Sequence, residues 1–243
     1  MTDGELFEND FSLPMRKKVL RARDFPNGPP LGPSVCGIDE AGRGPLAGPV
    51  YAAAVVLDAD FPLDFLDDSK ALSERRRLEA FSLIVSKALA WAVDWSSPSE
   101  IGELNILGAS LLAMRRAYMR AAAILARAGG ADLESAFSPV TPACGPRAPS
   151  SGDFVPALVY VDGNQLPDLG RPAVAVIKGD SIVPAIMAAS ILAKVARDRA
   201  MERFDWLYPE YGYARHKGYP TEEHRKLVKL LGPSPIQRPG FRC

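Results

Sequence analysis

Residues 50–57 (VYAAAVVL) form an almost continuous apolar run, and this run constrains the fold more than any other feature of the sequence. Such a run is typical of a β-strand that is buried on both faces. A shorter apolar segment, residues 35–39, precedes it, and only the Gly- and Pro-containing residues 40–49 separate the two. Because this connection is short, we expect the two strands to pair in antiparallel orientation within a sheet that carries helices on its faces.

The rest of the chain alternates between strand and helix patterns. Apolar residues recur at helical spacing in residues 73–88, with Ser73 as a candidate N-cap, and alternate as in a strand in residues 89–95. Residues 98–128 are predicted to be mostly helical, with Pro98 in the first turn. The later elements are two short strands at 158–162 and 173–177, a helix at 181–204 with Pro184 in its first turn, and a helix at 221–231 capped by Thr221. This order predicts an α/β fold with a mixed sheet.

A chain of 243 residues has room for one large domain or two small ones, and the order of elements favours one. We expect that domain to span residues 35–231. An irregular lead-in, residues 1–34, precedes it, and an irregular tail, residues 232–243, follows it. Residues 129–153 are rich in Gly, Pro and Ser, which predicts a flexible surface insertion within the domain.

The charges are balanced overall but unevenly placed along the chain. Lys and Arg number 29, as do Asp and Glu, so the net charge alone indicates no polyanionic partner. Residues 171–243, however, hold 13 basic and 7 acidic residues, whereas residues 1–170 hold 16 and 22. A basic C-terminal third on a neutral protein is what a localised phosphate-binding face would look like. An unevenly charged but merely solvated surface explains the count more simply, and both interpretations stay open.

The cysteines and the hydropathy of the sequence indicate in which cellular compartment the protein is expected. The three cysteines, Cys36, Cys144 and Cys243, form no CxxC pair, which is typical of a protein in a reducing compartment. The acidic start has no apolar signal-peptide core, and the apolar run at residues 183–193 is far shorter than the roughly 20 residues of a spanning helix. We therefore expect a soluble cytoplasmic protein that binds no membrane.

Carboxylates stand where three of the predicted strands end. Asp39 and Glu40 end the first strand, Asp162 ends the strand at 158–162, and Asp180 follows the strand at 173–177. In open α/β sheets ligands bind beyond the strand ends, so these side chains could converge at one edge. Like charges brought together raise one another's pKa, and a hard cation such as Mg²⁺ or Mn²⁺ would relieve the repulsion. Two such ions can clamp the attacking and leaving oxygens of a phosphoryl displacement.

Each of these features also has a simpler interpretation. Asp180 alone could be the N-cap of the next helix, and Asp162 before Gly163 could belong to an ordinary turn. The sequence Gly42-Arg43-Gly44 could be a plain tight turn, or it could bring bare backbone groups close to a substrate because glycine lacks a Cβ. Residues 215–219 (RHKGY) could grip phosphates and stack on a sugar or base, or they could be a surface loop.

Taken together, these segments resemble the bacterial ribonuclease HII family. Residues 37–48 (GIDEAGRGPLAG) resemble the opening motif of that family. Further motifs follow in the family's order: DSKALS at 68–73, ELNI at 103–106, VDGN at 161–164, KGDS at 178–181, AASILAKV at 188–195, RD at 197–198 and HKGYPT at 216–221. The resemblance runs from about Val35 to Leu231. The insertion is longer than the family leads us to expect, and the end of the chain is only loosely similar.

The resemblance implies a ribonuclease-H-like fold, with a mixed five-stranded sheet, flanking helices and a C-terminal helical segment. The implied activity is endonucleolytic hydrolysis of RNA in RNA–DNA hybrids, including a cut 5′ of a single ribonucleotide in duplex DNA. The products would be a 5′-phosphate and a 3′-hydroxyl. The implied cofactor is a divalent metal, Mn²⁺ or Mg²⁺. The expected partners are RNA–DNA hybrids and ribonucleotide-containing duplexes, bound by a monomer.

The resemblance also assigns roles to individual residues. Asp39 would be shared between two metal ions, with Glu40 and Asp162 on one side and Asp180 on the other, and these four carboxylates would be catalytic. The predicted substrate-binding residues are Gly42, Arg43 and Gly44, which would read the 2′-hydroxyl, Tyr219, which would pack on the neighbouring deoxyribose, and Lys70 and Lys217. Two other possibilities are a catalytically inactive nucleic-acid-binding protein and a related nuclease with another substrate. Hydrolysis of a duplex that carries one ribonucleotide would separate them.

Overall fold

The apolar run forms the central strand of the sheet. The computed structural model describes residues 19–26, 28–66, 72–126, 144–146, 156 and 158–241. Within them, β3 (Val50–Val56) is buried along its whole length. It pairs in antiparallel orientation with β2 (Val35–Ala41) and β4 (Ala90–Ser96), as the short connections predict. Its side chains alternate between two cores, because Tyr51, Ala53 and Val55 face one and Ala52, Ala54 and Val56 face the other.

The sheet is mixed, with the strand order β1-β7-β6-β2-β3-β4-β5. On one side of β2, the strands β6 (Leu158–Asp162) and β7 (Val174–Val176) run parallel to it. All five predicted strands are therefore present. Two short edge strands were not predicted: β1 (Val19–Leu20) lies in the lead-in, and β5 (Cys144–Pro146) lies in the insertion. In each segment only two or three residues pair through their backbones, and neither segment has an apolar run long enough to predict a strand.

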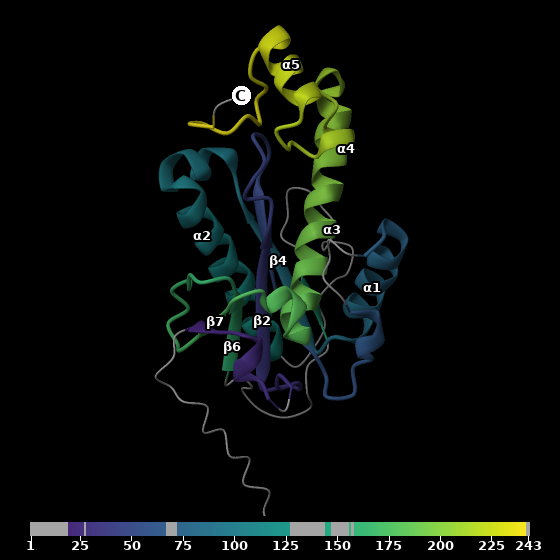
Figure 1. Cartoon of the computed structure of the whole chain (residues 1–243), viewed down its shortest axis with the longest axis vertical. Helices are drawn as coiled ribbons and strands as arrows, with labels where there is room; N and C mark the ends of the chain where they lie inside the picture. The colour runs from purple at the N-terminus through teal and green to yellow at the C-terminus, as the bar shows by residue number, and fades with distance from the viewer. Residues whose placement is uncertain are drawn as a thin grey trace, which may run out of the picture.

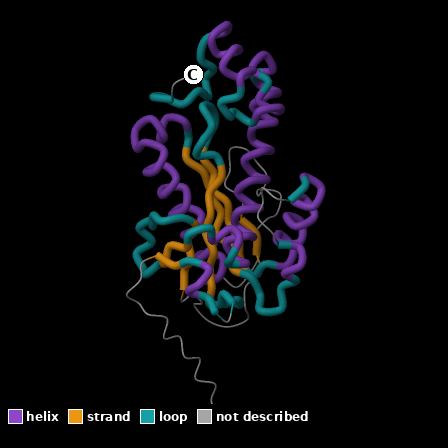
Figure 2. The backbone as a smooth tube through the Cα atoms, in the orientation of Figure 1, coloured by secondary structure: helices purple, strands orange, loops and turns teal. Residues whose placement is uncertain are grey.

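Helices cover both faces of the sheet (Figures 1 and 2). Helix α2 (Pro98–Ala126) packs on one face, and α1 (Glu74–Lys87) and α3 (Pro184–Leu207) pack on the other. The short α4 (Tyr213–His216) and α5 (Glu222–Leu231) continue beyond the end of α3. The hydroxyls of Ser73 and Thr221 accept backbone hydrogen bonds at the starts of α1 and α5, which confirms both caps. No helix among the described residues combines the length and the apolar character that crossing a membrane requires.

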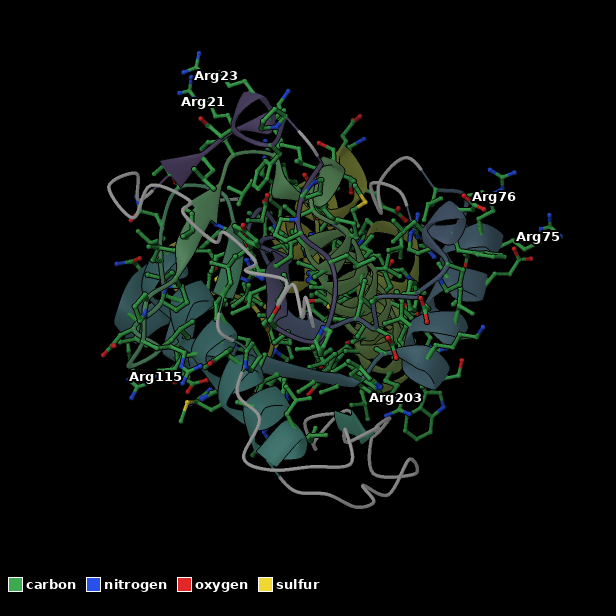
Figure 3. The ribbon with its side chains drawn as sticks, turned by 90° about the horizontal axis from the view of Figure 1, so that it is seen from below. Arg21, Arg23, Arg75, Arg76, Arg115 and Arg203 are labelled. Atoms are coloured by element: carbon green, nitrogen blue, oxygen red, sulfur yellow. The ribbon has the colours of Figure 1, made fainter. Side chains whose placement is uncertain are left out.

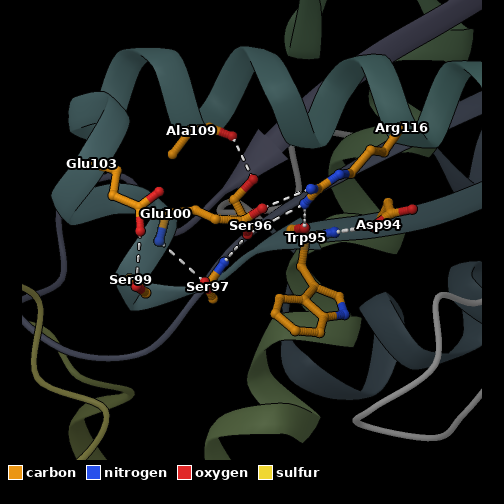
Figure 4. A network of polar contacts seen from close by, with 9 residues as sticks. All are labelled: Asp94, Trp95, Ser96, Ser97, Ser99, Glu100, Glu103, Ala109 and Arg116. Atoms are coloured by element: carbon orange, nitrogen blue, oxygen red, sulfur yellow. Dashed lines mark hydrogen bonds and ion pairs between the residues drawn. The ribbon is translucent and has the colours of Figure 1, made fainter.

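A polar network fixes the start of α2 against the end of β4 (Figure 4). The Ser97 N–H donates to Glu100 Oε2 at 2.8 Å, and the Glu100 N–H donates to Ser97 Oγ at 3.2 Å, which is a reciprocal capping box. Arg116, further along α2, donates to the Trp95 carbonyl at 3.0 Å and pairs with Glu100 at 2.6 Å. The helix also bends where Asn105 has a φ of 59°. The prediction that Pro98 lies in the first turn is confirmed.

Helix α3 lies directly on β2 where Gly37 has no side chain. An ideal Cβ at Gly37 would lie 2.1 Å from the carbonyl carbon of Ala185. The buried alanines Ala188 and Ala189 continue this close packing along α3. Helix and strand therefore meet almost backbone to backbone, and α3 continues over the residues that follow Gly37, with Ser190 at Asp39 and Arg197 at Gly42.

The tail, residues 232–241 in the described part, contains no helix or extended strand but is well packed. Gln237 forms an isolated bridge with Ala47, and Ile236 and Arg238 are buried. The tail crosses the same end of the molecule as the loop that joins β2 to β3 (Figure 1).

The contact at Gly37 yields a stability prediction. Gly37→Ala should lower the free energy of unfolding by about 3 kcal/mol, because the added methyl group would overlap backbone atoms of α3 that have no room to move. Urea denaturation measures this loss. Gly44→Ala is the matched control for stability, since its Cβ would make an ordinary 3.6 Å contact with Tyr219. Equal stability of the two variants would contradict the packing described here.

Candidate active site

Three carboxylates from three neighbouring chain segments meet at one edge of the sheet. Asp39 lies near the end of β2, Asp162 ends β6, and Asp180 lies in the turn after β7. Ile38 and Val161 are paired across β2 and β6, so Asp39 and Asp162 occupy neighbouring positions on parallel strands. One carboxylate oxygen from each of the three aspartates lies within 4.8 Å of the others. The structure thus brings together three of the four carboxylates predicted to form the site.

The turn after β7 holds Asp180 against Asp162. Lys178 adopts a left-handed conformation with a φ of 57°, and the short 3₁₀ turn Gly179–Ser181 follows. The Asp180 N–H donates to Asp162 Oδ1 at 3.3 Å. Helix α3 begins only at Pro184, so the predicted start at residue 181 is wrong, and Asp180 does not cap this helix. Residues 179–181 form a separate 3₁₀ turn ahead of α3 instead, and in this turn the Asp180 carboxylate lies close to that of Asp162.

Asp39 is the most enclosed of the three aspartates. It is 4% exposed and lies beneath α3, where the Ser190 hydroxyl hydrogen-bonds to its carboxylate. The Glu40 N–H donates to Asp39 Oδ1 at 2.7 Å. Ser190 belongs to the segment AASILAKV, but the sequence indicated no role for it.

Burial and mutual repulsion make the charged state of this cluster costly. Burial raises the pKa of Asp39 well above its usual range, and the charges of Glu40 and Asp162 raise it further. The pKa of Asp162 is also raised, first by burial and then by Asp180. The donor set is made only of carboxylate oxygens, which are the ligands that hard divalent cations prefer. The three side chains therefore fit a divalent cation, which would relieve the repulsion that raises these pKa values.

Glu40 lies beside the cluster but not within it. Strand β2 continues to Ala41, so Asp39 and Glu40 point to opposite faces of the strand. The Glu40 carboxylate forms an ion pair with Arg43 at 3.3 Å. Burial raises its pKa, the charge of Arg43 lowers it, and the charge of Asp162 raises it. The charge of Asp162 therefore acts on Glu40, although the Glu40 carboxylate is held by Arg43.

The two predicted substrate-binding loops lie side by side. A Cβ at Gly44 would touch Tyr219 Cε1 at 3.6 Å, and the Leu46 N–H donates to the Gly218 carbonyl at 2.8 Å. Gly42 has a φ of 98°, a conformation that favours glycine. The Tyr219 side chain is 40% exposed. Gly44 and Tyr219 thus form one continuous surface. Arg43, which precedes Gly44, forms an ion pair with Glu40, the residue next to Asp39.

Two stacked histidines support the backbone at Tyr219. The rings of His216 and His224 are parallel, with centroids 4.3 Å apart. His216 Nδ1 accepts the Gly218 N–H at 3.1 Å, and His224 Nδ1 donates to the Tyr219 carbonyl at 2.9 Å. Both histidines are buried, so their hydrogen bonds hold the backbone at Gly218 and Tyr219 in one position.

The two predicted lysine contacts have different outcomes. Lys70 lies outside the described residues. Lys217 is 19% exposed in its side chain, and its ammonium pairs with Glu202 at 2.6 Å. A contact between Lys217 and a substrate phosphate would have to compete with this ion pair.

Positive charge on the surface is not confined to the basic C-terminal third. Figure 3 shows six arginines at the rim of the molecule whose side chains extend into solvent, and only one of them, Arg203, belongs to residues 171–243. Within that third, several basic residues pair with neighbouring acids: Lys194 with Asp198, Arg215 with Glu223, Lys217 with Glu202 and Lys226 with Glu222. These four basic side chains are therefore held by acidic neighbours, so the positive excess of this third rests on its other basic residues.

Two buried arginines lie beneath the loops, and no pattern in the sequence indicated a role for either. Arg197 on α3 is 1% exposed and Arg238 in the tail is 2% exposed. Arg197 belongs to the family motif RD at residues 197–198, but the motif alone does not indicate what Arg197 does. Arg238 stands in a segment that has no periodicity at all.

Comparison with known proteins identifies the family. A sequence model described as ribonuclease HII matches residues 36–128 and 152–242. A curated ribonuclease HII from Treponema denticola is 44% identical over 210 residues, which cover 85% of this chain and 97% of that protein. The chain belongs to the ribonuclease HII family. The gap between the two matched regions falls in the predicted insertion, and the second region includes most of the tail.

Solved structures agree with this assignment. The ribonuclease HII of Archaeoglobus fulgidus, solved in complex with PCNA, has a TM-score of 0.59 and 26% identity, with 86% of this chain and 95% of that chain covered. The ribonuclease H2 of Pyrococcus horikoshii OT3 has a TM-score of 0.55 and 24% identity, with 86% and 93% covered. The second likeness supports the fold alone. The ribonuclease-H-like architecture predicted from the sequence is confirmed.

The raised carboxylate pKa values yield a prediction for the metal-free protein. In the unfolded chain Asp39 loses its proton near pH 4, whereas in the folded chain it keeps the proton to higher pH, so folding stability falls as the pH rises from about 4. In EDTA, Asp39→Asn should therefore raise the Tm relative to the parent by roughly 2–4 °C at pH 7, and by less at lower pH.

Thermal melts across this pH range measure the difference. Mg²⁺ should raise the Tm of the parent and leave that of Asp39→Asn nearly unchanged, because only the parent has the full set of ligands. Asp168→Asn makes the same chemical change at an exposed residue and is the control. A destabilising effect of Asp39→Asn that is the same at every pH would contradict the account.

Proposed function

We propose that this chain is an endoribonuclease that hydrolyses the RNA strand of RNA–DNA hybrids and cuts 5′ of single ribonucleotides in duplex DNA. The products are a 5′-phosphate and a 3′-hydroxyl. The observation that carries the proposal is the convergence of Asp39, Asp162 and Asp180 beside the surface formed by Gly44 and Tyr219. Membership in the ribonuclease HII family supports it.

The carboxylates would hold the divalent cation, Mn²⁺ or Mg²⁺. Asp39, Asp162 and Asp180 are close enough to share a ligand, and Glu40 would join them when it exchanges Arg43 for the cation. Such a cation activates water and offsets the charge of a phosphodiester. Ser190 keeps the Asp39 carboxylate in place, and the Asp180 N–H does the same for Asp162.

The loops would supply selectivity for ribonucleotides. A 2′-hydroxyl is the group that distinguishes RNA from DNA, and backbone N–H groups beside a glycine can approach it closely. The ring of Tyr219 offers an apolar face to the deoxyribose next to the ribonucleotide. The histidine support beneath it keeps this face in one orientation.

The direct test is cleavage of a DNA duplex that contains one ribonucleotide, with Mg²⁺, Mn²⁺ or EDTA. We expect a single cut on the 5′ side of the ribonucleotide with either metal, and none in EDTA. Binding without cleavage under all conditions would instead favour an inactive nucleic-acid-binding protein. Cleavage of an all-DNA duplex would favour a related nuclease with another substrate.

Replacement of one carboxylate should separate chemistry from binding. Asp162→Asn should abolish cleavage while the fold and duplex affinity stay close to those of the parent, because the amide keeps the shape but loses the charge that holds the cation. Asp168→Asn, an exposed residue just beyond the same strand, is the matched control. Asp162→Asn activity within about threefold of the parent at saturating Mg²⁺ would reject the assignment.

Tyr219 should determine junction selectivity rather than chemistry. Tyr219→Phe keeps the ring face and should retain parental activity. Tyr219→Ala should lose roughly ten- to a hundredfold in kcat/KM on a duplex with one ribonucleotide, since such ring contacts are worth ~1–3 kcal/mol. The loss on a long RNA–DNA hybrid should be smaller, because a ribose occupies the neighbouring position there. Equal losses on the two substrates would show that Tyr219 has only a structural role.

A further inference from the structure

Arg238 in the tail binds the loop that joins β2 to β3 through backbone carbonyls alone. Its Nε donates to Gly48 O at 2.7 Å, and its Nη1 donates to Arg43 O and Pro45 O at 3.1 and 2.8 Å. Its Nη2 donates to the carbonyls of Gly42 and Pro49. One guanidinium therefore binds five carbonyl oxygens within residues 42–49, and its side chain is almost completely buried.

These hydrogen bonds determine where the neighbouring N–H groups point. In a planar trans peptide the C=O and the N–H of the next residue point in opposite directions. Because the carbonyls of Gly42 and Arg43 point at Arg238, the N–H groups of Arg43 and Gly44 point away from it. Neither N–H group has an acceptor within the described residues. Arg238 thus turns these two N–H groups toward the side of the loop opposite its own guanidinium, and Arg43 and Gly44 are both exposed.

Arg197 supports the same loop from α3. Its Nη2 donates to the Lys217 carbonyl at 2.9 Å, and its guanidinium lies 5.6 Å from the centre of the Tyr219 ring. A Cβ at Gly42 would lie 2.0 Å from Arg197 Nε, so the loop backbone rests directly on this side chain. Neither Arg197 nor Arg238 pairs with a carboxylate in the described part of the chain. Burial and then the charge of Arg197 lower the pKa of Arg238 to about 9.

Two buried cations without an acidic partner are costly unless each N–H finds an acceptor. Carbonyl oxygens fill this requirement for Arg238, and only an arginine offers five donors in one plane. A lysine would keep the charge, but its three donors would diverge from one atom. The hydrogen bonds from Arg238 therefore fix the shape of the loop, while the burial of its charge limits what they add to the free energy of unfolding.

We infer that Arg238 is a positioning residue that orients the Arg43 and Gly44 N–H groups to bind the 2′-hydroxyl oxygen of the ribonucleotide. This inference rests on the proposed function and extends it to the tail. Donors that are already oriented before substrate binds require no rearrangement of the loop. The loop, Arg238 and Tyr219 thus act as one recognition unit.

The test compares the affinities of the protein for two duplexes that differ only in one 2′-hydroxyl. Fluorescence anisotropy in EDTA, which prevents cleavage, gives the Kd for the ribonucleotide-containing duplex and for its all-DNA counterpart. The parent should prefer the ribonucleotide, and Arg238→Lys should reduce this preference about tenfold while the Kd for the all-DNA duplex changes by less than about threefold. Arg225→Lys, the same change at an exposed residue of α5, should leave the preference unchanged.

A loss of fold alone would weaken binding to both duplexes and leave no selective effect. Hydrogen exchange of the parent gives a second measurement that does not depend on the variant: residues 43 and 44 should be more protected with the ribonucleotide duplex than with the all-DNA duplex. An unchanged preference in folded Arg238→Lys, or equal protection by the two duplexes, would overturn the inference. Failure of the proposed function would appear separately, as absence of cleavage by the parent with Mg²⁺ or Mn²⁺.

Discussion

The contact between α3 and β2 at Gly37 is the constraint on which the rest of the site depends. Because no side chain separates the two elements there, α3 runs close over the strand and reaches the end of the sheet. Ser190 comes to lie over Asp39, and about two turns later Arg197 comes to lie under Gly42 and Tyr219. One helix therefore positions both the carboxylates and the loops. A change in its distance from β2 would displace both parts together.

The carboxylates and the arginines are charged groups that the fold buries at a cost. Asp39 and Asp162 repel each other and are poorly solvated, and Arg197 and Arg238 are buried close together. Buried charges that destabilise a fold are often found at functional sites. Here the buried aspartates and the buried arginines lie at the same end of the sheet. A cation would compensate the acidic group, whereas backbone carbonyls already compensate Arg238. The Arg238 guanidinium is therefore satisfied by the protein itself, whereas the three aspartates fit a divalent cation as their counter-charge.

The sequence predicts the fold well where side-chain patterns determine it. The buried strand at residues 50–57 and the caps at Ser73 and Thr221 depend on residue types that the sequence displays. The edge strands β1 and β5 could not be predicted, because a few backbone hydrogen bonds form them.

The same distinction applies to the site. The aspartates could be found because they follow apolar strands, whereas the opposite orientation of Glu40 depends on β2 continuing to Ala41. The role of Arg238 could not be predicted, since its partners are backbone carbonyls as far as 196 residues away in the chain. Every residue type has such a carbonyl, so no sequence pattern indicates the contact. The family motifs locate the chemistry, but they do not show what holds the recognition loop in shape.

The central claim is that Asp39, Asp162 and Asp180 form a site for a divalent cation. Crystals of the protein soaked in Mn²⁺ test it most directly, because the anomalous signal of manganese locates the ion without assumptions about the protein. The account predicts an anomalous peak between the three carboxylates, with Glu40 turned away from Arg43 toward it if a second ion binds. Well-diffracting soaked crystals with no peak at these carboxylates, or with manganese bound only elsewhere, would contradict it.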